Sequence, residues 1–185
     1  NVKHKKMKIL ANDGISQSGV DDLTAAGFEV LTTTVAQEQL VNFINSENIV
    51  ALLVRSATTV RQDLIDACPG LKIIGRGGVG MDNIDVGYAR EKGLSVINTP
   101  AASSESVAEL VFAHLFSGVR FLYDSNRSMP LEGEKKFKNL KKAYAKGTEL
   151  RGKTLGVIGF GRIGQATAKM ALGLGMKVIA FDPFI

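Results

Sequence analysis

The hydrophobic positions of the first hundred residues form short apolar runs separated by longer amphipathic stretches. The runs predict five strands, over residues 7–11, 29–33, 49–54, 71–75 and 94–98. The stretches between them repeat apolar residues at helical spacing, which predicts helices over residues 16–26, 37–46, 60–67 and 84–92. Strands that alternate with helices form a parallel sheet covered on both faces. The pattern therefore predicts a flavodoxin-like α/β domain whose ligands bind at the carboxyl ends of the strands.

A different arrangement begins after Asn98-Thr99-Pro100, where the alternation stops. We place a domain boundary there, with a first domain over residues 1–100 and a second over residues 101–185. The second domain is predicted to begin with one long helix over residues 103–123, capped by Ser103 or Ser104. A polar, lysine-rich connector without strong periodicity follows. A strand (154–158), a helix (162–174) and a strand (177–181) then predict the first part of a Rossmann domain.

Composition narrows the class of protein. The chain has 185 residues, 45% of them hydrophobic, which is enough for a sizeable core. Its longest apolar runs are far shorter than the roughly 18 residues that span a bilayer, and no signal peptide is recognisable. The single cysteine, Cys68, excludes an internal disulfide and a cysteine metal cluster. We therefore expect a cytoplasmic protein without a metal site, in which residues 1–6 are an upstream leader without a function.

The net charge of +5 is concentrated in one segment. Residues 120–153 hold ten basic and four acidic side chains, and this excess of six is larger than the net charge of the whole chain. The segment is either a solvated connector or a local field that attracts an anionic small molecule. Because no nucleic-acid motif accompanies it, we predict no nucleic-acid partner. Neither His4 nor His114 lies in a catalytic motif, and His114 is predicted to be a packed or interface residue.

Gly159, Gly161 and Gly164 have the G-x-G-x-x-G spacing, and they lie between a predicted strand and a predicted helix. The first glycine permits a tight turn, the second lets the backbone approach a pyrophosphate, and the third brings the helix close to the strand. Asp182 follows 18 positions after Gly164 (182 − 164) and ends the next strand. A carboxylate there accepts hydrogen bonds from the adenosine ribose and repels a 2′-phosphate, which favours NAD over NADP. The alternative is a glycine-rich turn beside a surface aspartate.

Two arginines follow neighbouring strands of the first domain. Arg55 begins the loop after the third strand, and Arg76 lies in a glycine-rich stretch after the fourth. Guanidinium groups bind carboxylate or phosphate through paired hydrogen bonds, so two of them suit a small ligand with two anionic groups. The alternative is two surface salt bridges and a turn.

With these motifs the sequence resembles the D-isomer-specific 2-hydroxyacid dehydrogenase family. The resemblance covers residues 7–185. It rests on VRSATTV (54–60), GRGGVGMDNID (75–85), INTP (97–100), SVAEL (106–110), GTELRGKTLGVIGFGRIG (147–164) and FDP (181–183). The arginine of GRGGVG points to the members that act on a phosphorylated substrate.

The resemblance implies oxidation of 3-phosphoglycerate at its C2 hydroxyl, with the hydride passing to NAD, as the entry step of serine synthesis. The residues implied in substrate binding are Arg55, Ser56 and Arg76, with the amides of Gly77 and Gly78. The residues implied in cofactor binding are Val79, Gly159, Gly161, Arg162, Ile163, Gly164 and Asp182. A connector lysine, Lys141 or Lys142, would reach the phosphate. Ser103 stands where many members have asparagine.

The family's catalytic arginine and glutamate–histidine pair belong to the later half of its nucleotide domain. No motif of this chain matches them, so we assign no catalytic residue and expect the chain alone to be inactive, as part of a longer enzyme. An open sheet edge is expected to cause instability or swapped association. The resemblance also implies a homo-oligomer formed through the helix near residues 103–123. Two other functions are considered: a relative that reduces hydroxypyruvate or glyoxylate, and a non-catalytic NAD-binding or sensing module.

Overall fold

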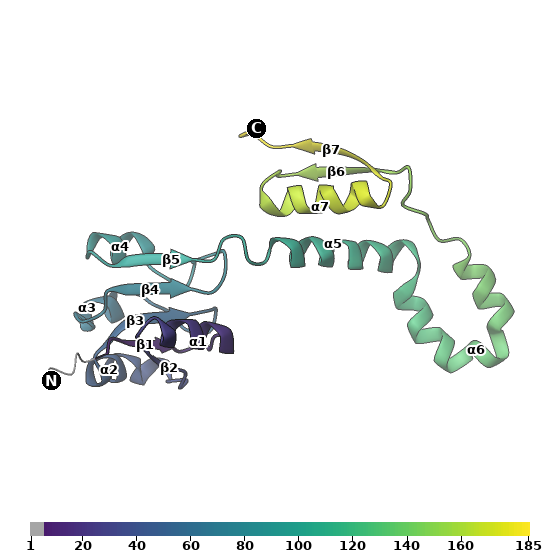
Figure 1. Cartoon of the computed structure of the whole chain (residues 1–185). Helices are drawn as coiled ribbons and strands as arrows, with labels where there is room; N and C mark the ends of the chain where they lie inside the picture. Colours follow the sequence, from purple (N-terminus) through teal and green to yellow (C-terminus); the bar gives the residue numbers. More distant parts are fainter. Residues whose placement is uncertain (1–5) are drawn as a thin grey trace. The chain divides into compact units, whose positions relative to one another are not determined.

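The computed structural model describes residues 6–185 and divides the chain into two compact units (Figure 1). Unit 1 ends at Pro100, and unit 2 is Ala101–Ile185. The expected leader falls almost entirely on residues 1–5, which lie outside the described residues.

Unit 1 is built on five parallel strands in the order β2-β1-β3-β4-β5. The strands are β1 (Lys8–Ala11), β2 (Glu29–Leu31), β3 (Ile49–Val54), β4 (Ile73–Arg76) and β5 (Ser95–Asn98). This order is that of flavodoxin, so the predicted fold class is confirmed. Val54 pairs with Arg76, and Arg76 pairs with Asn98. The carboxyl ends of β3, β4 and β5 are therefore level with one another.

Helices connect the strands of unit 1 (Figure 1). They are α1 (Gln17–Ala25), α2 (Gln37–Glu47), α3 (Gln62–Ala67) and α4 (Val86–Glu91). The central strands contribute the middle of the core, where Leu10, Leu52 and Ile74 are fully buried. Leu40 and Ile44 of α2 join the same cluster. Continuous apolar runs such as that of β3 are what a sheet covered on both faces requires.

Two of the predicted helices begin two residues later than expected. Val60 and Ile84, which start the predicted helices, instead pair as an isolated parallel bridge. The amide of Val60 donates to the Asn83 carbonyl at 2.8 Å, and the amide of Asp85 donates to the Val60 carbonyl at 3.0 Å. Both residues are buried. They are therefore hydrophobic because they form this bridge, and not because they begin a helix. The bridge joins the loop after β3 to the loop after β4.

Unit 2 contains helix α5 (Ser104–Val119), helix α6 (Leu122–Tyr144) and a β-α-β unit. The β-α-β unit consists of β6 (Thr154–Ile158), α7 (Arg162–Gly173) and β7 (Lys177–Phe181), with the two strands parallel. Side chains from α5, α7 and the strands share one apolar cluster around Phe112 and Ala171. The other face of the two-stranded sheet carries exposed apolar side chains, among them Ile158, Ile179 and Phe181. The expected instability or swapped association stays a prediction.

Most of the lysine-rich connector is helical, which the sequence analysis did not predict. The long helix ends at Val119, and the chain turns at Phe121, which has φ 57°, before α6 begins. Helix α6 is bent at Lys136 and folds back (Figure 1). The ring centroids of Phe121 and Tyr144, which lie at the two ends of this segment, are 6.0 Å apart. Gly133 is its only buried residue. Pro130 and the non-helical Lys136 interrupt the helix, and they are the features of its sequence that argue against a continuous helix here.

The start of α5 also differs in detail from the prediction. Ser103 occupies the capping position, but its side chain makes no capping hydrogen bond. His114 is exposed on this helix rather than packed within its own unit. Within residues 6–185, no helix combines the length and the apolar character needed to cross a membrane.

Candidate functional site

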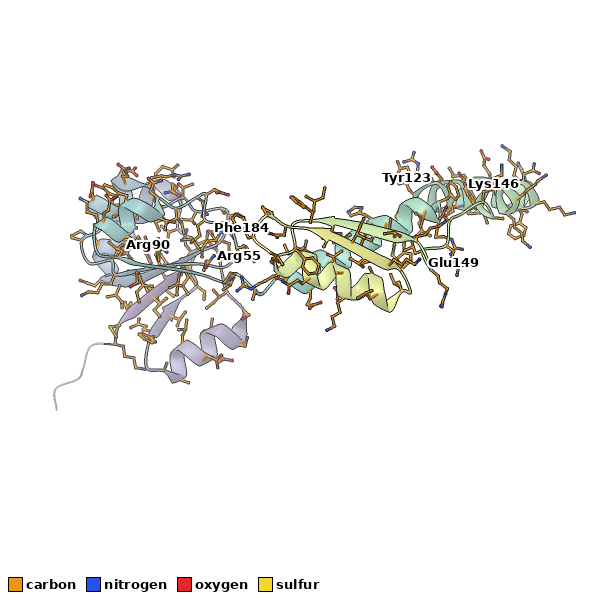
Figure 2. The ribbon with its side chains drawn as sticks, turned by 90° about the horizontal axis from the view of Figure 1, so that it is seen from above. Arg55, Arg90, Tyr123, Lys146, Glu149 and Phe184 are labelled. Carbon is orange, nitrogen blue, oxygen red and sulfur yellow. The ribbon has the colours of Figure 1, made fainter. Side chains whose placement is uncertain are left out.

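A pocket of about 750 Å³ lies at the carboxyl ends of four strands of unit 1. Its walls come from the loop after β1, from the ends of β3 and β4, and from residues 97–99 at the end of β5. Arg55 and Arg76 both line it, and Figure 2 labels Arg55 at this edge of the sheet. The pocket includes the ends of β1 and β3, between which the strand order reverses, as expected for ligand sites in open parallel sheets.

Asp13 fixes the loop that carries Arg55. Its carboxylate accepts hydrogen bonds from the amides of Arg55 at 2.6 Å and Thr58 at 3.1 Å, and from the Thr58 hydroxyl at 2.5 Å. Partial burial opposes ionisation of Asp13, but these hydrogen bonds outweigh it and lower the pKa of the carboxyl. The neighbouring Asn12 is buried and binds the Thr58 hydroxyl oxygen at 2.8 Å and the Val35 backbone. The first turn of this loop is therefore rigidly held.

The guanidinium of Arg76 lies across Gly78. A methyl group built on Gly78 would lie 1.5 Å from the Nη1 atom of Arg76 and 2.7 Å from its Cζ atom. Only glycine leaves this space, so Gly78 serves the placement of the arginine. The Nε atom of Arg76 donates to the Asn83 side chain over a long 3.5 Å. Gly78 leaves room for the half-buried Arg76 side chain, and the Asn83 hydrogen bond holds it against the loop that follows β4.

The amides of Gly77 and Gly78 already donate within the protein. The Gly77 amide donates to the Val54 carbonyl at 2.8 Å, and the Gly78 amide donates to the Arg76 carbonyl at 3.0 Å. A substrate carboxylate could reach these amides only by sharing or replacing those hydrogen bonds. The Asn98 side chain donates to the carbonyl of exposed Val79 at 2.7 Å, which ties the glycine-rich loop to the end of β5.

Each of the three glycines in the glycine-rich loop of unit 2 has a different structural explanation. Gly159 has φ 90°, a conformation that side chains rarely adopt. A methyl group on Gly164 would lie 2.2 Å from the Gly159 carbonyl oxygen, so the third glycine allows α7 to approach β6. Gly161 has neither constraint, because its φ is −68° and an added methyl group would meet nothing within 4 Å. Internal packing therefore leaves Gly161 unexplained, whereas close approach of a ligand explains it.

Asp182 holds the same loop from the end of β7. Its carboxylate accepts hydrogen bonds from the Phe160 amide at 2.6 Å and from the Phe184 amide at 2.9 Å. The amides of Phe184 and Phe160 lower the pKa of this carboxyl. An ionised carboxylate has about four acceptor positions, so about two remain for the hydroxyls of a ligand. Arg162 and Ile163 form the first turn of α7, whose leading amides lack intrahelical partners and attract anions.

The structure gathers some of the predicted site residues and separates others. Arg55, Arg76 and Gly77 line one pocket, while Ser56, Gly78 and Val79 lie in its loops without lining it. The predicted cofactor residues of unit 2 meet around the start of α7, and Lys141 and Lys142 lie in the last turn of α6. Sequence reasoning missed the polar side chains that hold the loops, namely Asp13, Asn83 and Asn98. Their position after parallel strands was a usable signal, because such residues meet at one edge of the sheet.

A pocket at the sheet edge and a glycine-rich β-α-β unit are together typical of a nucleotide-binding α/β protein. Comparison with known families makes the class specific. Residues 9–175 match the model described as D-isomer specific 2-hydroxyacid dehydrogenase, catalytic domain. The chain belongs to this family of oxidoreductases.

Known relatives and a solved structure agree with this assignment. The chain is 48% identical over 155 residues to a hydroxypyruvate reductase of Thermotoga maritima, covering 84% of this chain and 48% of the relative. It is 42% identical over 179 residues to a D-3-phosphoglycerate dehydrogenase of Methanocaldococcus jannaschii, covering 97% of this chain and 33% of the relative. The NAD⁺-bound 3-phosphoglycerate dehydrogenase of Entamoeba histolytica superimposes with a TM-score of 0.72 at 31% identity, covering 98% of this chain and 55% of that one. The chain therefore spans between a third and about half of the length of these three proteins.

Proposed function

We propose that this chain supplies the substrate pocket and the adenosine side of the cofactor site of an NAD-dependent D-2-hydroxyacid dehydrogenase. The proposed reaction is oxidation of D-3-phosphoglycerate at its C2 hydroxyl to 3-phosphohydroxypyruvate, a step that feeds serine synthesis. The observation that carries this proposal is that two arginines from neighbouring strands line one pocket.

The pocket of unit 1 suits a small ligand with two anionic groups. Neighbouring strands of a sheet are about 4.8 Å apart, so the Arg55 and Arg76 side chains leave the sheet close together. 3-Phosphoglycerate carries a carboxylate at one end and a phosphate at the other, and each can pair with a guanidinium. The Asp13 carboxylate also lines the pocket, but it is engaged by the amides and hydroxyl of the Arg55 loop. We therefore assign the binding of anions to the guanidinium groups. The amides of Gly77 and Gly78 become further donors once the ligand replaces the Val54 and Arg76 carbonyls as their acceptors.

The residues of unit 2 fit the adenosine half of NAD. The space at Gly161 admits a pyrophosphate, and the leading amides of α7 supply donors for it. Asp182 has acceptor positions left for ribose hydroxyls, and its negative charge disfavours a 2′-phosphate. When bound, the nicotinamide of NAD accepts the hydride from C2 of the substrate. The residues described here bind and orient the two ligands.

We further propose that this chain binds its ligands without turning them over. Removal of the hydroxyl proton needs a base whose pKa lies near the working pH. No histidine lines the pocket of unit 1, and its one acidic residue, Asp13, has a lowered pKa. His114 is exposed on α5, within the part of the chain that belongs to unit 2.

A homo-oligomer is part of the same proposal. Helix α5 carries several exposed apolar side chains, including Leu110, Val111 and Phe116. An apolar helix surface of this kind is typical of a subunit interface. We place the assembled enzyme in the cytoplasm, because the single cysteine suits a reducing compartment.

Hydroxypyruvate reduction is the second candidate function, and it is favoured by the 48% identity to the Thermotoga relative. It differs in substrate, because hydroxypyruvate has a carboxylate but no phosphate and needs only one arginine. A non-catalytic NAD-binding module is the third, and it would need no substrate pocket.

Calorimetric titration of this chain with 3-phosphoglycerate, D-glycerate and hydroxypyruvate distinguishes these functions. We expect the phosphorylated ligand to bind most tightly and Arg76→Ala to remove most of that preference. The whole enzyme should likewise reduce NAD faster with 3-phosphoglycerate than with D-glycerate or D-lactate. Equal affinity for phosphorylated and unphosphorylated ligands would refute the proposed substrate, and binding of NAD alone would favour the module.

A further inference from the structure

One side chain, Asn83, connects both arginine-bearing loops of unit 1. Its Nδ2 atom donates to the carbonyls of Arg55 at 2.8 Å and Thr58 at 2.7 Å. Its Oδ1 atom accepts from the Nε atom of Arg76 at 3.5 Å, the outer limit of a hydrogen bond. The amide thus uses both its donor hydrogens on the loop after β3 and its acceptor on the arginine that ends β4.

The loop after β3 is held from two sides by side chains of opposite hydrogen-bonding capacity. The Asp13 carboxylate accepts from the amides of Arg55 and Thr58, while the Asn83 amide donates to the carbonyls of the same two residues. A carboxylate cannot donate, and an amide group cannot replace a carboxylate as acceptor for all three donors around Asp13. The orientation of residues 55–58 therefore depends on an acid at position 13 and an amide at position 83.

The Asn83 side chain is not needed to join the two loops. Their backbones are already paired through the bridge between Val60 and Ile84. An ion pair between Arg61 and Asp85, at 2.9 Å, adds a second connection. The side-chain bonds of Asn83 lie at the arginine end of this junction, where they act on Arg55 and Arg76 rather than on the joining of the loops.

We propose that Asn83 is a positioning residue that orients Arg55 and Arg76 toward one anionic ligand. The inference rests on the proposed function, since it concerns the same pocket. A free arginine side chain loses considerable rotamer entropy when it binds an anion. Asn83 restrains Arg76 before binding, in the space that Gly78 leaves free, and Asn83 fixes the backbone from which the Arg55 side chain starts. Less entropy is then lost when the ligand arrives.

The test compares Asn83→Ala and Asn83→Asp with a matched control, Gln37→Ala. Gln37 is also a side-chain amide bonded to this loop, donating to the Thr59 carbonyl at 2.9 Å and accepting from the Thr59 amide at 3.1 Å. Within residues 6–185, its side chain makes no hydrogen bond with either arginine. If Asn83 only stiffened the loop, the two alanine variants would affect ligand affinity similarly.

Calorimetric titration of the 185-residue chain with 3-phosphoglycerate is the first measurement. We expect Asn83→Ala to weaken binding about tenfold, the equivalent of one hydrogen bond to a charged group, and Gln37→Ala to leave the affinity unchanged. Asn83→Asp should weaken binding further, because the introduced carboxylate pairs with Arg76 and competes with the ligand. Aspartate also lacks the donors that reach the Arg55 and Thr58 carbonyls, so the comparison with Gln37→Ala separates the positioning role from a general loss of loop stability. Binding by Asn83→Asp as tight as that of the original chain overturns the inference.

Nuclear magnetic resonance of the arginine Nε–H groups is the second measurement, and it needs no ligand. We expect the Arg76 signal, assigned with Arg76→Lys, to exchange faster with water and to shift in Asn83→Ala but not in Gln37→Ala. An unchanged Arg76 signal overturns the inference. If the original chain fails to bind 3-phosphoglycerate, the proposed function falls, and the Arg76 signal alone still decides the role of Asn83.

Discussion

Replacing Gly164 by alanine tests the close approach of α7 to β6. The added methyl group would lie 2.2 Å from the Gly159 carbonyl oxygen and 3.1 Å from its carbonyl carbon. A backbone atom cannot rotate aside as a side chain can, so the helix has to move away from the strand. Overpacking of this kind costs about 1–3 kcal/mol. We expect the free energy of unfolding to fall by about 2 kcal/mol, which moves a urea midpoint by roughly 1 M.

Gly161→Ser is the matched variant in the same loop. A Cβ atom added there meets nothing within 4 Å, and Gly161 is the N-cap of α7. Serine is a favoured N-cap residue, so the free energy of unfolding should be unchanged or slightly increased. The nucleotide should nevertheless bind much more weakly, because the side chain fills the space at which a pyrophosphate would approach the backbone.

Urea unfolding followed by circular dichroism and titration with NAD separate the two effects. The expected result is a loss of stability in Gly164→Ala alone and a loss of NAD affinity without loss of stability in Gly161→Ser. Two results would refute the reasoning. An unchanged urea midpoint for Gly164→Ala would mean that the close contact is not a constraint, and undiminished NAD binding by Gly161→Ser would mean that the open space serves another purpose.

Four further changes have defined outcomes. Asp182→Ala should weaken NAD binding and reduce the preference for NAD over NADP, and titration with both cofactors would contradict this if the preference stayed the same. Gly78→Ala should displace the Arg76 guanidinium and weaken binding of 3-phosphoglycerate with little change in urea midpoint, so an unaltered affinity would argue against the placement of Arg76. Because the pKa of Asp13 is lowered, its contribution to stability is present above the ordinary carboxyl pKa and is lost as the pH falls through the lowered value. Urea midpoints of Asp13→Ala and the original chain should therefore differ at pH 7 and begin to converge as the pH falls below about 4; a constant difference would exclude this linkage. Leu110→Glu should reduce the molecular mass of the assembled enzyme in light scattering, and an unchanged mass would place the interface elsewhere.

The first unit could be predicted well because its strands are buried on both faces. The apolar run of residues 49–54 has no other plausible setting than a central strand, and it forms β3 with the predicted bounds. Element ends were less predictable where buried residues serve another purpose. Val60 and Ile84 are apolar because they bridge two loops, a contact between residues 24 positions apart that no local periodicity reveals.

Helix α6 was not predicted, because few of its residues are buried. Its residues are mostly exposed, and it contains Pro130 and a non-helical residue, Lys136, where the helix bends. The contacts it does make are local, such as the exposed ion pair between Lys136 and Glu132. Interactions of this kind leave little trace in a hydrophobic pattern, which reports burial.

The candidate site was predictable in its charged residues but not in its supporting residues. Arg55 and Arg76 could be identified because two arginines beside glycines after parallel strands are unusual. Asp13 and Asn83 lie 42 and 28 residues from Arg55 in the sequence. Their roles depend on spatial distances to its loop, and only the structure gives those distances. The position of the Arg76 guanidinium over Gly78 was also not predictable. The sequence shows that residue 78 is a glycine, but it does not show that a guanidinium occupies the place of the missing side chain.

The return of α6 to its own starting point has a consequence for the tolerance of the chain to insertions and deletions. Phe121 and Tyr144 are in ring contact, and the Thr148 amide donates to the Val119 carbonyl at 2.9 Å, so the segment between them leaves and re-enters unit 2 at one place. A short turn could bridge the same gap, and a longer arm could grow from it, with β6, α7 and β7 undisturbed. The length of this arm is therefore free to vary between proteins that share the sheet and the glycine loop.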